Sequence, residues 1–293
     1  MPKKITDNIS FADIFNTVYG WIAFLTINLI QFIFTIPIVI ISLITFDKDR
    51  RLITYMTKFF TFAFFYTFLT YRIRIETNGV KPPKKGERRI YVVNHSSIFD
   101  VIMMLALPGC IKSLMKAYYT KLPLIGFFAT ISGHVVLKDD SDSTDYMDTL
   151  EKLGAKIERG NPLVIYPEGT RSRDGKIGKF YGGAFKIALD TKSDIVPVVF
   201  DSWNAIRPGA YWIRDTKPHI RILDPIPYNS IKDLSYRKLA TMTRTIILDG
   251  LVNLRNSRRL NEPNYYRHCD KFVLIDKEME AELNELKSKT SNS

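Results

Sequence analysis

The chain has 293 residues, of which 46% are hydrophobic and 13% aromatic, and this composition excludes a disordered protein. Its 42 basic and 30 acidic residues give a formal net charge of +12, which favours an anionic partner such as a membrane surface, a nucleic acid or a phosphorylated substrate. The two cysteines, Cys110 and Cys269, lack the spacing of a disulfide framework. The four scattered histidines also lack metal-binding spacing, so we expect no structural metal.

The N-terminal part, residues 1–76, is predicted to form helices that anchor the chain in a membrane. No charged residue occurs in Ile14–Phe46, and this run exceeds the roughly 20 residues that cross a bilayer. It either spans with tilt or turns within the membrane near Pro37. A second run, Phe59–Tyr71, is too short to span, and its aromatic residues are typical of the lipid interface. Basic residues flank both runs, which places the following domain on the cytoplasmic side and favours a hairpin or re-entrant helix. A cleaved signal peptide is the alternative.

The middle of the chain, residues 77–275, is predicted to form one α/β domain with a mixed central sheet flanked by helices, and residues 276–293 a charged, partly helical, solvated tail. Strands are expected at Ile90–Asn94, His134–Lys138, Leu163–Tyr166, Ile195–Phe200 and His219–Leu223. Helices are expected near Ile98–Leu107, Thr144–Arg159, Gly183–Thr191 and Ile231–Leu254. An acidic run is interpreted as a solvated helix start rather than a metal site, and it consists of Asp139, Asp140, Asp142 and Asp145.

A histidine and an aspartate follow the first predicted strand, Ile90–Asn94. His95 and Asp100 are five residues apart, and on one helix that spacing would place them on different faces. They meet only if His95 precedes the helix and Asp100 lies in its first turn, with Ser96 or Ser97 as the cap. The carboxylate would then fix the tautomer of the imidazole and stabilise its protonated form. The alternative is a histidine with a purely structural hydrogen bond.

The buried strand Leu163–Tyr166 runs into a second motif, Pro167–Ser172. Gly169 permits a tight turn, Arg171 offers a two-pronged donor for a phosphate, and Glu168 offers an acceptor for a hydroxyl. The alternative is a solvated turn with an ordinary surface arginine. Five specified residues in sequence seldom occur by chance, so we interpret this motif as part of a site.

These motifs, taken in order, resemble the glycerolipid acyltransferase family, especially its lysophosphatidate acyltransferases. The family pattern is Asn-His-x4-Asp, a glycine-containing segment that ends in a basic residue, Phe-Pro-Glu-Gly-Thr-Arg-Ser, and a Val-Pro strand. The matching segments are Asn94–Asp100, Leu122–Lys138, Tyr166–Ser172 and Ile195–Val198. Two positions depart from the pattern. Tyr166 replaces the usual Phe, and Lys138 replaces the usual Arg, which keeps the charge but loses the two-pronged donor.

The resemblance implies a catalytic pair. His95 would be the general base that takes the proton from the acceptor hydroxyl, and Asp100 would orient it. The hydroxyl would attack the acyl thioester directly, without an acyl-enzyme. The donor would be acyl-coenzyme A or acyl carrier protein, and no cofactor is expected.

The resemblance also implies an acceptor site, in which three cations hold the phosphate and the Pro-Glu-Gly-Thr-Arg loop positions the glycerol. The implied substrate-binding residues are Lys116, Lys138, Glu168, Gly169, Thr170 and Arg171.

The expected function is therefore transfer of a fatty acyl group to lysophosphatidate, giving phosphatidate in phospholipid biosynthesis. The expected partners are a lysophospholipid, the acyl donor and membrane lipid, without nucleic acid. One alternative keeps the chemistry and changes the acceptor to another lysolipid, such as a lyso-ornithine lipid. Others are a thioester hydrolase and a catalytically silent membrane protein that binds phospholipid.

Overall fold

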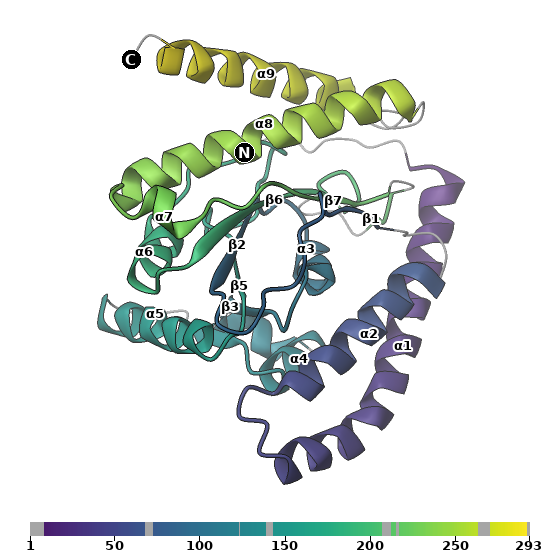
Figure 1. Cartoon of the computed structure of the whole chain (residues 1–293). Coiled ribbons are helices and arrows are strands. Elements are labelled where there is room, and N and C mark those ends of the chain that lie inside the picture. Colours follow the sequence, from purple (N-terminus) through teal and green to yellow (C-terminus); the bar gives the residue numbers. More distant parts are fainter. Residues whose placement is uncertain are drawn as a thin grey trace.

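The structure is a computed structural model in which one sheet lies between helices, with two N-terminal helices set to one side (Figure 1). It describes residues 9–67, 73–122, 124–138, 143–206, 212–214, 217–262 and 270–291.

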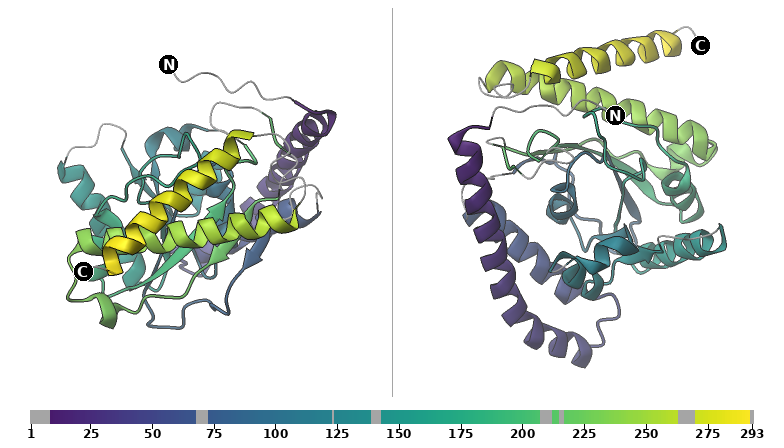
Figure 2. Two further views of the ribbon diagram at one scale, coloured as in Figure 1. Left: turned by 90° about the horizontal axis from the view of Figure 1, so that it is seen from above. Right: turned by 180° about the vertical axis from the view of Figure 1, so that it is seen from behind.

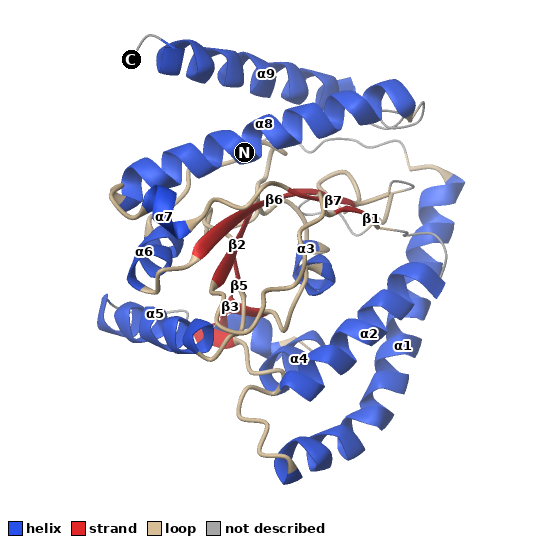
Figure 3. Cartoon of the chain, viewed as in Figure 1, coloured by secondary structure: helices blue, strands red, loops and turns tan. Residues whose placement is uncertain are grey.

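The sheet of the described residues has seven strands in the order β1-β7-β6-β2-β5-β3-β4 (Figure 3). The strands are β1 Arg74–Glu76, β2 Arg89–Val93, β3 Lys112–Lys116, β4 Val135–Leu137, β5 Leu163–Ile165, β6 Asp194–Asp201 and β7 His219–Ile222. From β6 to β4 all neighbours are parallel, whereas β7 is antiparallel to β6 and parallel to β1. The mixed α/β sheet predicted from the sequence is thereby confirmed.

The two faces of the sheet carry separate hydrophobic cores, because successive side chains of a strand point to opposite faces. On β2, Ile90 and Val92 join a core with α5, α6, α8 and α9, while Tyr91 and Val93 join a core with α1, α2 and α3. Strands buried on both faces are continuously apolar, as expected for a parallel sheet covered by helices. Their carboxyl ends are therefore held rigidly from both sides.

The helices largely follow the predicted ranges. They are α1 Phe11–Ile44, α2 Arg51–Thr67, α3 Asp100–Met103, α4 Ile125–Ile131, α5 Ser143–Glu158, α6 Gly183–Asp190, α7 Tyr228–Ile231, α8 Tyr236–Asn261 and α9 Asp270–Ser291. Short 3-10 turns, η1 Met104–Ala106 and η2 Ala117–Lys121, follow α3 and β3. The helix predicted near Ile98–Leu107 is thus one turn of α-helix that tightens into a 3-10 turn.

Helix α1 is long and apolar enough to cross a membrane by length and composition, so it is a candidate membrane segment. It continues through Pro37, so of the two alternatives left open by the sequence, the turn near that residue is wrong. The chain instead reverses after Ile44, and α2 returns along α1 (Figure 1). The outward face of α1 is apolar, whereas its inward face carries Asn28 and Gln31. A helix in water has the opposite arrangement, so this face suits lipid.

Several elements differ from the sequence predictions, among them helix α4, which was not predicted. The strands β1 and β3 were not predicted, since β1 has three residues and β3 begins and ends with lysine. The last helix, α9, begins before the predicted tail and buries Met279 and Leu283 against the core. The prediction that the tail is helical is confirmed. The prediction that it is solvated is wrong for the face of α9 that carries Met279 and Leu283. The boundaries predicted at 76/77 and 275/276 stay predictions.

Several predicted features lie outside the described residues. They are the end of the aromatic run at 68–71, the acidic residues Asp139, Asp140 and Asp142, and Cys269. Among the described residues, no group of three or more histidine, cysteine or acidic side chains could hold a metal ion.

Candidate active site

Asn94 fixes the backbone from which the site is built. Its side-chain amide donates to the carbonyl of Phe200 at 2.9 Å, and its carbonyl accepts from the amide of Phe200 at 2.8 Å. These two bonds join the end of β2 to β6 where the ladder stops. His95 therefore leaves the sheet from a fixed point.

His95 and Asp100 form the predicted pair, with Nδ1 of the imidazole 2.7 Å from Oδ2 of the carboxylate. Asp100 is fully buried and is the first residue of α3, so the prediction that it lies in the first helical turn is confirmed. Because a carboxylate oxygen accepts, we assign the imidazole proton to Nδ1, which leaves the lone pair on Nε2.

The predicted helix cap is wrong, because the roles of the residues are reversed. The cap position is Phe99, without a capping side chain. Instead, the backbone amides of Ser96 and Ser97 donate to Oδ2 of Asp100 at 2.7 and 2.9 Å, and the hydroxyl of Ser202 donates to Oδ1. Counting His95, four donors surround the carboxylate and hold it in one orientation.

Tyr166 supports the pair from below. Its ring stacks on the imidazole of His95 at 4.4 Å between centroids, and its hydroxyl donates to the carbonyl of Asp100 at 2.8 Å. Burial raises the pKa of this hydroxyl well above its usual value, so it stays a donor. This contact was not predicted, since the sequence showed only a substitution for the usual Phe.

Glu168 joins the two sequence motifs instead of facing the cavity. Its Oε1 accepts from the amide of His95 and its Oε2 from the amide of Gly178, both at 2.8 Å. The side chain is 6% exposed, and burial raises the pKa of the carboxyl to about 7 against the opposing effect of those two bonds. Both oxygens are occupied, so the geometry favours a positioning role over contact with the acceptor.

A cavity of about 500 Å³ opens at the carboxyl ends of β2, β5 and β3. Parallel strands place their functional residues at this edge of a sheet. Five of the predicted site residues line the cavity, and they are His95, Lys116, Gly169, Thr170 and Arg171. Among the described residues, neither Lys116 nor Arg171 has an ion pair, so both charges are available to a ligand.

Three predicted residues do not line this cavity, and one of them is the buried Asp100, which contacts His95. Lys138 lies just beyond β4 with its side chain 73% exposed, and its Nζ is 2.9 Å from Asp145. Glu168 lies behind the loop, as described above. Gly169 has the expected tight-turn conformation, with a φ of +66° that favours glycine.

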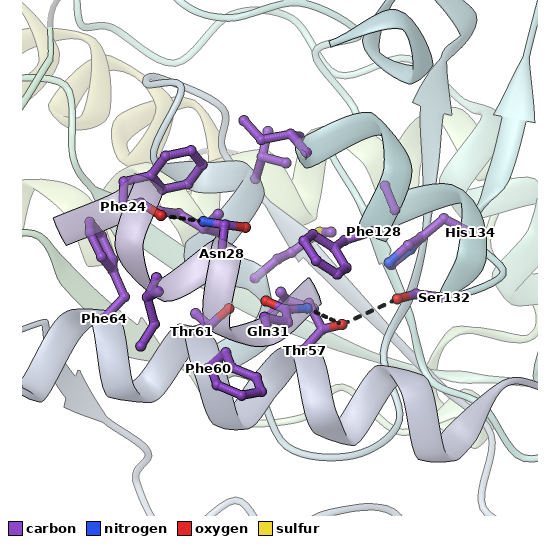
Figure 4. Close-up of a pocket in the computed structure, with 17 residues that line it drawn as sticks. Phe24, Asn28, Gln31, Thr57, Phe60, Thr61, Phe64, Phe128, Ser132 and His134 are labelled. Atoms are coloured by element: carbon purple, nitrogen blue, oxygen red, sulfur yellow. Dashed lines mark hydrogen bonds between the residues drawn. The ribbon is translucent and has the colours of Figure 1, made fainter. Parts of the chain in front are cut away.

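A smaller, mostly apolar cavity of about 70 Å³ adjoins the first between α1, α2 and the domain (Figure 4). Phe24, Phe60 and Phe128 form much of its wall, and Gln31 donates to Thr57 at 3.2 Å within it. The two cavities share five wall residues, Val101, Met104, Ile125, Ala129 and His134. The site therefore continues from a cationic mouth toward an apolar interior.

His134 is the other histidine that lines the cavity, and its surroundings exclude it as the base. Its Nδ1 accepts from the amide of Ser113 at 3.0 Å. Burial, followed by the charges of Lys112 and Lys156, lowers its pKa to about 3. An imidazole with such a pKa takes up protons poorly near neutral pH, which leaves His95 as the candidate base.

Residues 73–201 match the family model described as Acyltransferase. This match covers 129 of the 293 residues, so the similarity to the acyltransferase family holds for this region of the chain. This region contains both sequence motifs and strand β6, which ends directly before Ser202.

The chain is similar to curated proteins and to solved structures, of which we describe two relatives and one structure. It is 32% identical over 165 residues to the chloroplastic 1-acyl-sn-glycerol-3-phosphate acyltransferase of Arabidopsis thaliana, covering 56% of this chain and 45% of the relative. It is 31% identical over 137 residues to the human beta form, covering 46% of this chain and 49% of the relative. The chain thus spans about half the length of these relatives. The 1-acyl-sn-glycerophosphate acyltransferase PlsC from Thermotoga maritima shares the fold, with a TM-score of 0.68, 21% identity and coverage of 83% and 96%.

Proposed function

We propose that the protein transfers a fatty acyl group from a thioester donor to the free hydroxyl of lysophosphatidate. One observation carries this proposal: the available Nε2 of His95 shares a cavity with Lys116 and Arg171, two cations without ion pairs among the described residues. A phosphate monoester carries close to two negative charges near neutral pH, and an arginine can meet two of its oxygens. The activities after which the relatives are named support the same acceptor.

The reaction proceeds by general base catalysis. Nε2 of His95 takes the proton as the acceptor oxygen attacks the thioester carbonyl, and Asp100 stabilises the resulting imidazolium. The tetrahedral adduct collapses by breaking the carbon–sulfur bond, and the imidazolium returns its proton to the departing thiolate. The products are the acylated acceptor and the free thiol, and the enzyme is unchanged.

The apolar outward face of α1 supports a membrane location for this reaction. Phe11 and Ile33 are 83% and 64% exposed on that face. Burying such side chains in lipid is favourable, and the acceptor is itself held in a bilayer. We place the catalytic domain on the cytoplasmic side, as the basic flanks predict.

The test is an assay of the purified full-length protein with labelled acyl-coenzyme A and a panel of lysolipids. We expect transfer to lysophosphatidate to exceed transfer to lysolipids that lack a phosphate monoester, such as lyso-ornithine lipid. A higher rate with one of those acceptors would contradict lysophosphatidate as the acceptor. Release of labelled free fatty acid without acylated lipid would indicate a thioester hydrolase. Binding of phospholipid without turnover of any donor would indicate the silent alternative.

A further inference from the structure

A second, cationic groove lies beside the catalytic cavity, between the loop 179–182 and the start of α8. Its volume is about 330 Å³, near the lower limit for small-molecule sites. Lys179, Arg237 and Arg244 line it, together with the rings of Tyr181 and Tyr236, and no acidic residue is among its lining residues. The groove therefore offers positive charge and aromatic faces to one ligand.

The three cations of this groove are not equivalent. Arg244 is fully engaged, because it donates to the carbonyls of Ile177 and Gly178 and pairs with Glu282 at 2.7 Å. Within the described part of the chain, Lys179 and Arg237 have no ion pair. Arg244 thus builds the floor of the groove, and the other two charges are available to a ligand.

The groove has a fixed shape because Gly182 packs directly against Tyr236. A Cβ at Gly182 would lie 2.5 Å from the tyrosine ring, so only glycine allows this contact. The ring is therefore held against the backbone that leads into α6, although Tyr236 is still 41% exposed. Arg237 lies over the same ring, with its guanidinium carbon 5.8 Å from the centroid.

Tyr181 connects the groove to the catalytic cavity, since it lines both. Its amide donates to the carbonyl of Pro167 at 2.8 Å, which fixes the loop to the Pro-Glu-Gly-Thr-Arg motif. The start of α8 lies on the side of the sheet away from α1 and α2 in each view (Figures 1 and 2). A ligand in the groove would therefore approach from water, and not from the apolar helices.

We propose that this groove binds the adenosine and phosphates of an acyl-coenzyme A donor, while the thioester end reaches His95 past Tyr181. The inference rests on the proposed acyl transfer and names its donor. Lys179 and Arg237 supply charge for phosphates, and the exposed ring of Tyr181 supplies a face for the adenine. An acyl carrier protein presents its thioester on an arm that lacks the adenosine, so it would bring no adenine to the Tyr181 ring.

The experiment compares two donors that share the acyl thioester, acyl-coenzyme A and acyl-pantetheine, which lacks the nucleotide. Lys179→Glu and Arg237→Glu should each raise the KM for acyl-coenzyme A roughly tenfold or more, since each removes one charged contact. The rate with acyl-pantetheine and the KM for lysophosphatidate should stay within about twofold of the wild type. Lys152→Glu is the matched control, because it makes the same charge change on the exposed face of α5.

Binding is measured separately from turnover, by calorimetry of adenosine 3′,5′-bisphosphate with the full-length His95→Ala protein. Binding that is weakened by Lys179→Glu and Arg237→Glu, and not by Lys152→Glu, supports the nucleotide site in the groove. If the nucleotide binds in this way but no acyl transfer is found, the proposed function is contradicted and the groove assignment is not. The groove assignment is overturned if the nucleotide does not bind or if the variants lower the rate equally with acyl-coenzyme A and acyl-pantetheine. It is also overturned if the variants impair only transfer from acyl carrier protein.

Discussion

Glu168→Gln tests whether this buried carboxylate positions the catalytic histidine or contacts the acceptor. The carboxylate accepts one amide hydrogen on each oxygen, from His95 and from Gly178. A glutamine has one acceptor oxygen, so one of the two amides would face its NH2 group. Leaving a buried donor unsatisfied costs about 1–3 kcal/mol. We expect kcat to fall on the order of tenfold to a hundredfold, because His95 would shift.

The same substitution should change the pH dependence of stability. The folded pKa of Glu168 is about 7, above its usual value of 4.5, so the folded state holds the proton more tightly than the unfolded state. This contribution to stability is fully present below about pH 4.5 and is lost as the pH rises through about 7. The difference corresponds to roughly 3 kcal/mol. Glutamine does not titrate, so the contribution disappears in the variant.

The assay is denaturant unfolding of both proteins in the same detergent at pH 4.5 and pH 8. The free energy of unfolding of the wild type, minus that of the variant, should decrease with pH by roughly this amount. A difference that is constant or rises with pH would refute the reasoning about burial. A selective increase in the KM for the acceptor, without loss of kcat, would restore the predicted contact with the glycerol.

Expectations for five further variants follow from the site and from α1. His95→Ala should lower acyl transfer at least roughly 10²-fold while circular dichroism and Tm stay unchanged. Asp100→Asn should lower the rate of acyl transfer less than His95→Ala does. The asparagine amide can keep its oxygen toward the imidazole and turn its NH2 toward Ser202, whose hydroxyl can accept. Arg171→Ala should raise the KM for lysophosphatidate roughly 30- to 150-fold, from about 2–3 kcal/mol. The exposed, paired Lys138 should tolerate alanine in the same assay. Ile33→Lys should lower the membrane-bound fraction on sedimentation, because lysine is unfavourable in lipid by about 2.5–3.5 kcal/mol.

The sequence allowed the catalytic pair to be predicted because helix geometry leaves one solution for a spacing of five residues. The contact between Ser202 and Asp100 could not be predicted, because Ser202 is 102 residues away along the chain and is brought close by the pairing of β2 with β6. Contacts that depend on sheet order are absent from any local pattern. The Pro167–Ser172 loop was likewise recognisable, but the inward direction of Glu168 depends on amides of two other segments, at His95 and at Gly178.

The charge of the lysines likewise did not indicate which of their side chains would be buried and which exposed. Lys112 and Lys116 are four residues apart on β3, on the same face of the strand, and yet Lys112 is buried and Lys116 is exposed. Lys112 donates to Thr54 of α2 at 2.8 Å and to a carbonyl near α4 at 2.6 Å. Its burial follows from the docking of α2, which no strand pattern contains. The exposed position of Lys138 similarly follows from the end of β4 and from its partner on α5.

The docking of α1 gives the N-terminal helices a role beyond attachment to lipid. At its start, buried Asp13 pairs with Arg214 at 3.1 Å, and Thr17 accepts from the amide of Ile213 at 2.9 Å.

The amide of Arg214 in turn donates to the carbonyl of Ala205, in the segment whose Ser202 holds Asp100. The start of α1 and the catalytic carboxylate are thus joined through one short stretch of chain. Phe64 and Phe65 of α2 are also buried in the core beneath β2 and β6. Deleting residues 1–71 would remove part of this core together with the anchor. Loss of activity after such a deletion would therefore report on folding as much as on access to the membrane, whereas a single outward charge on α1 separates the two.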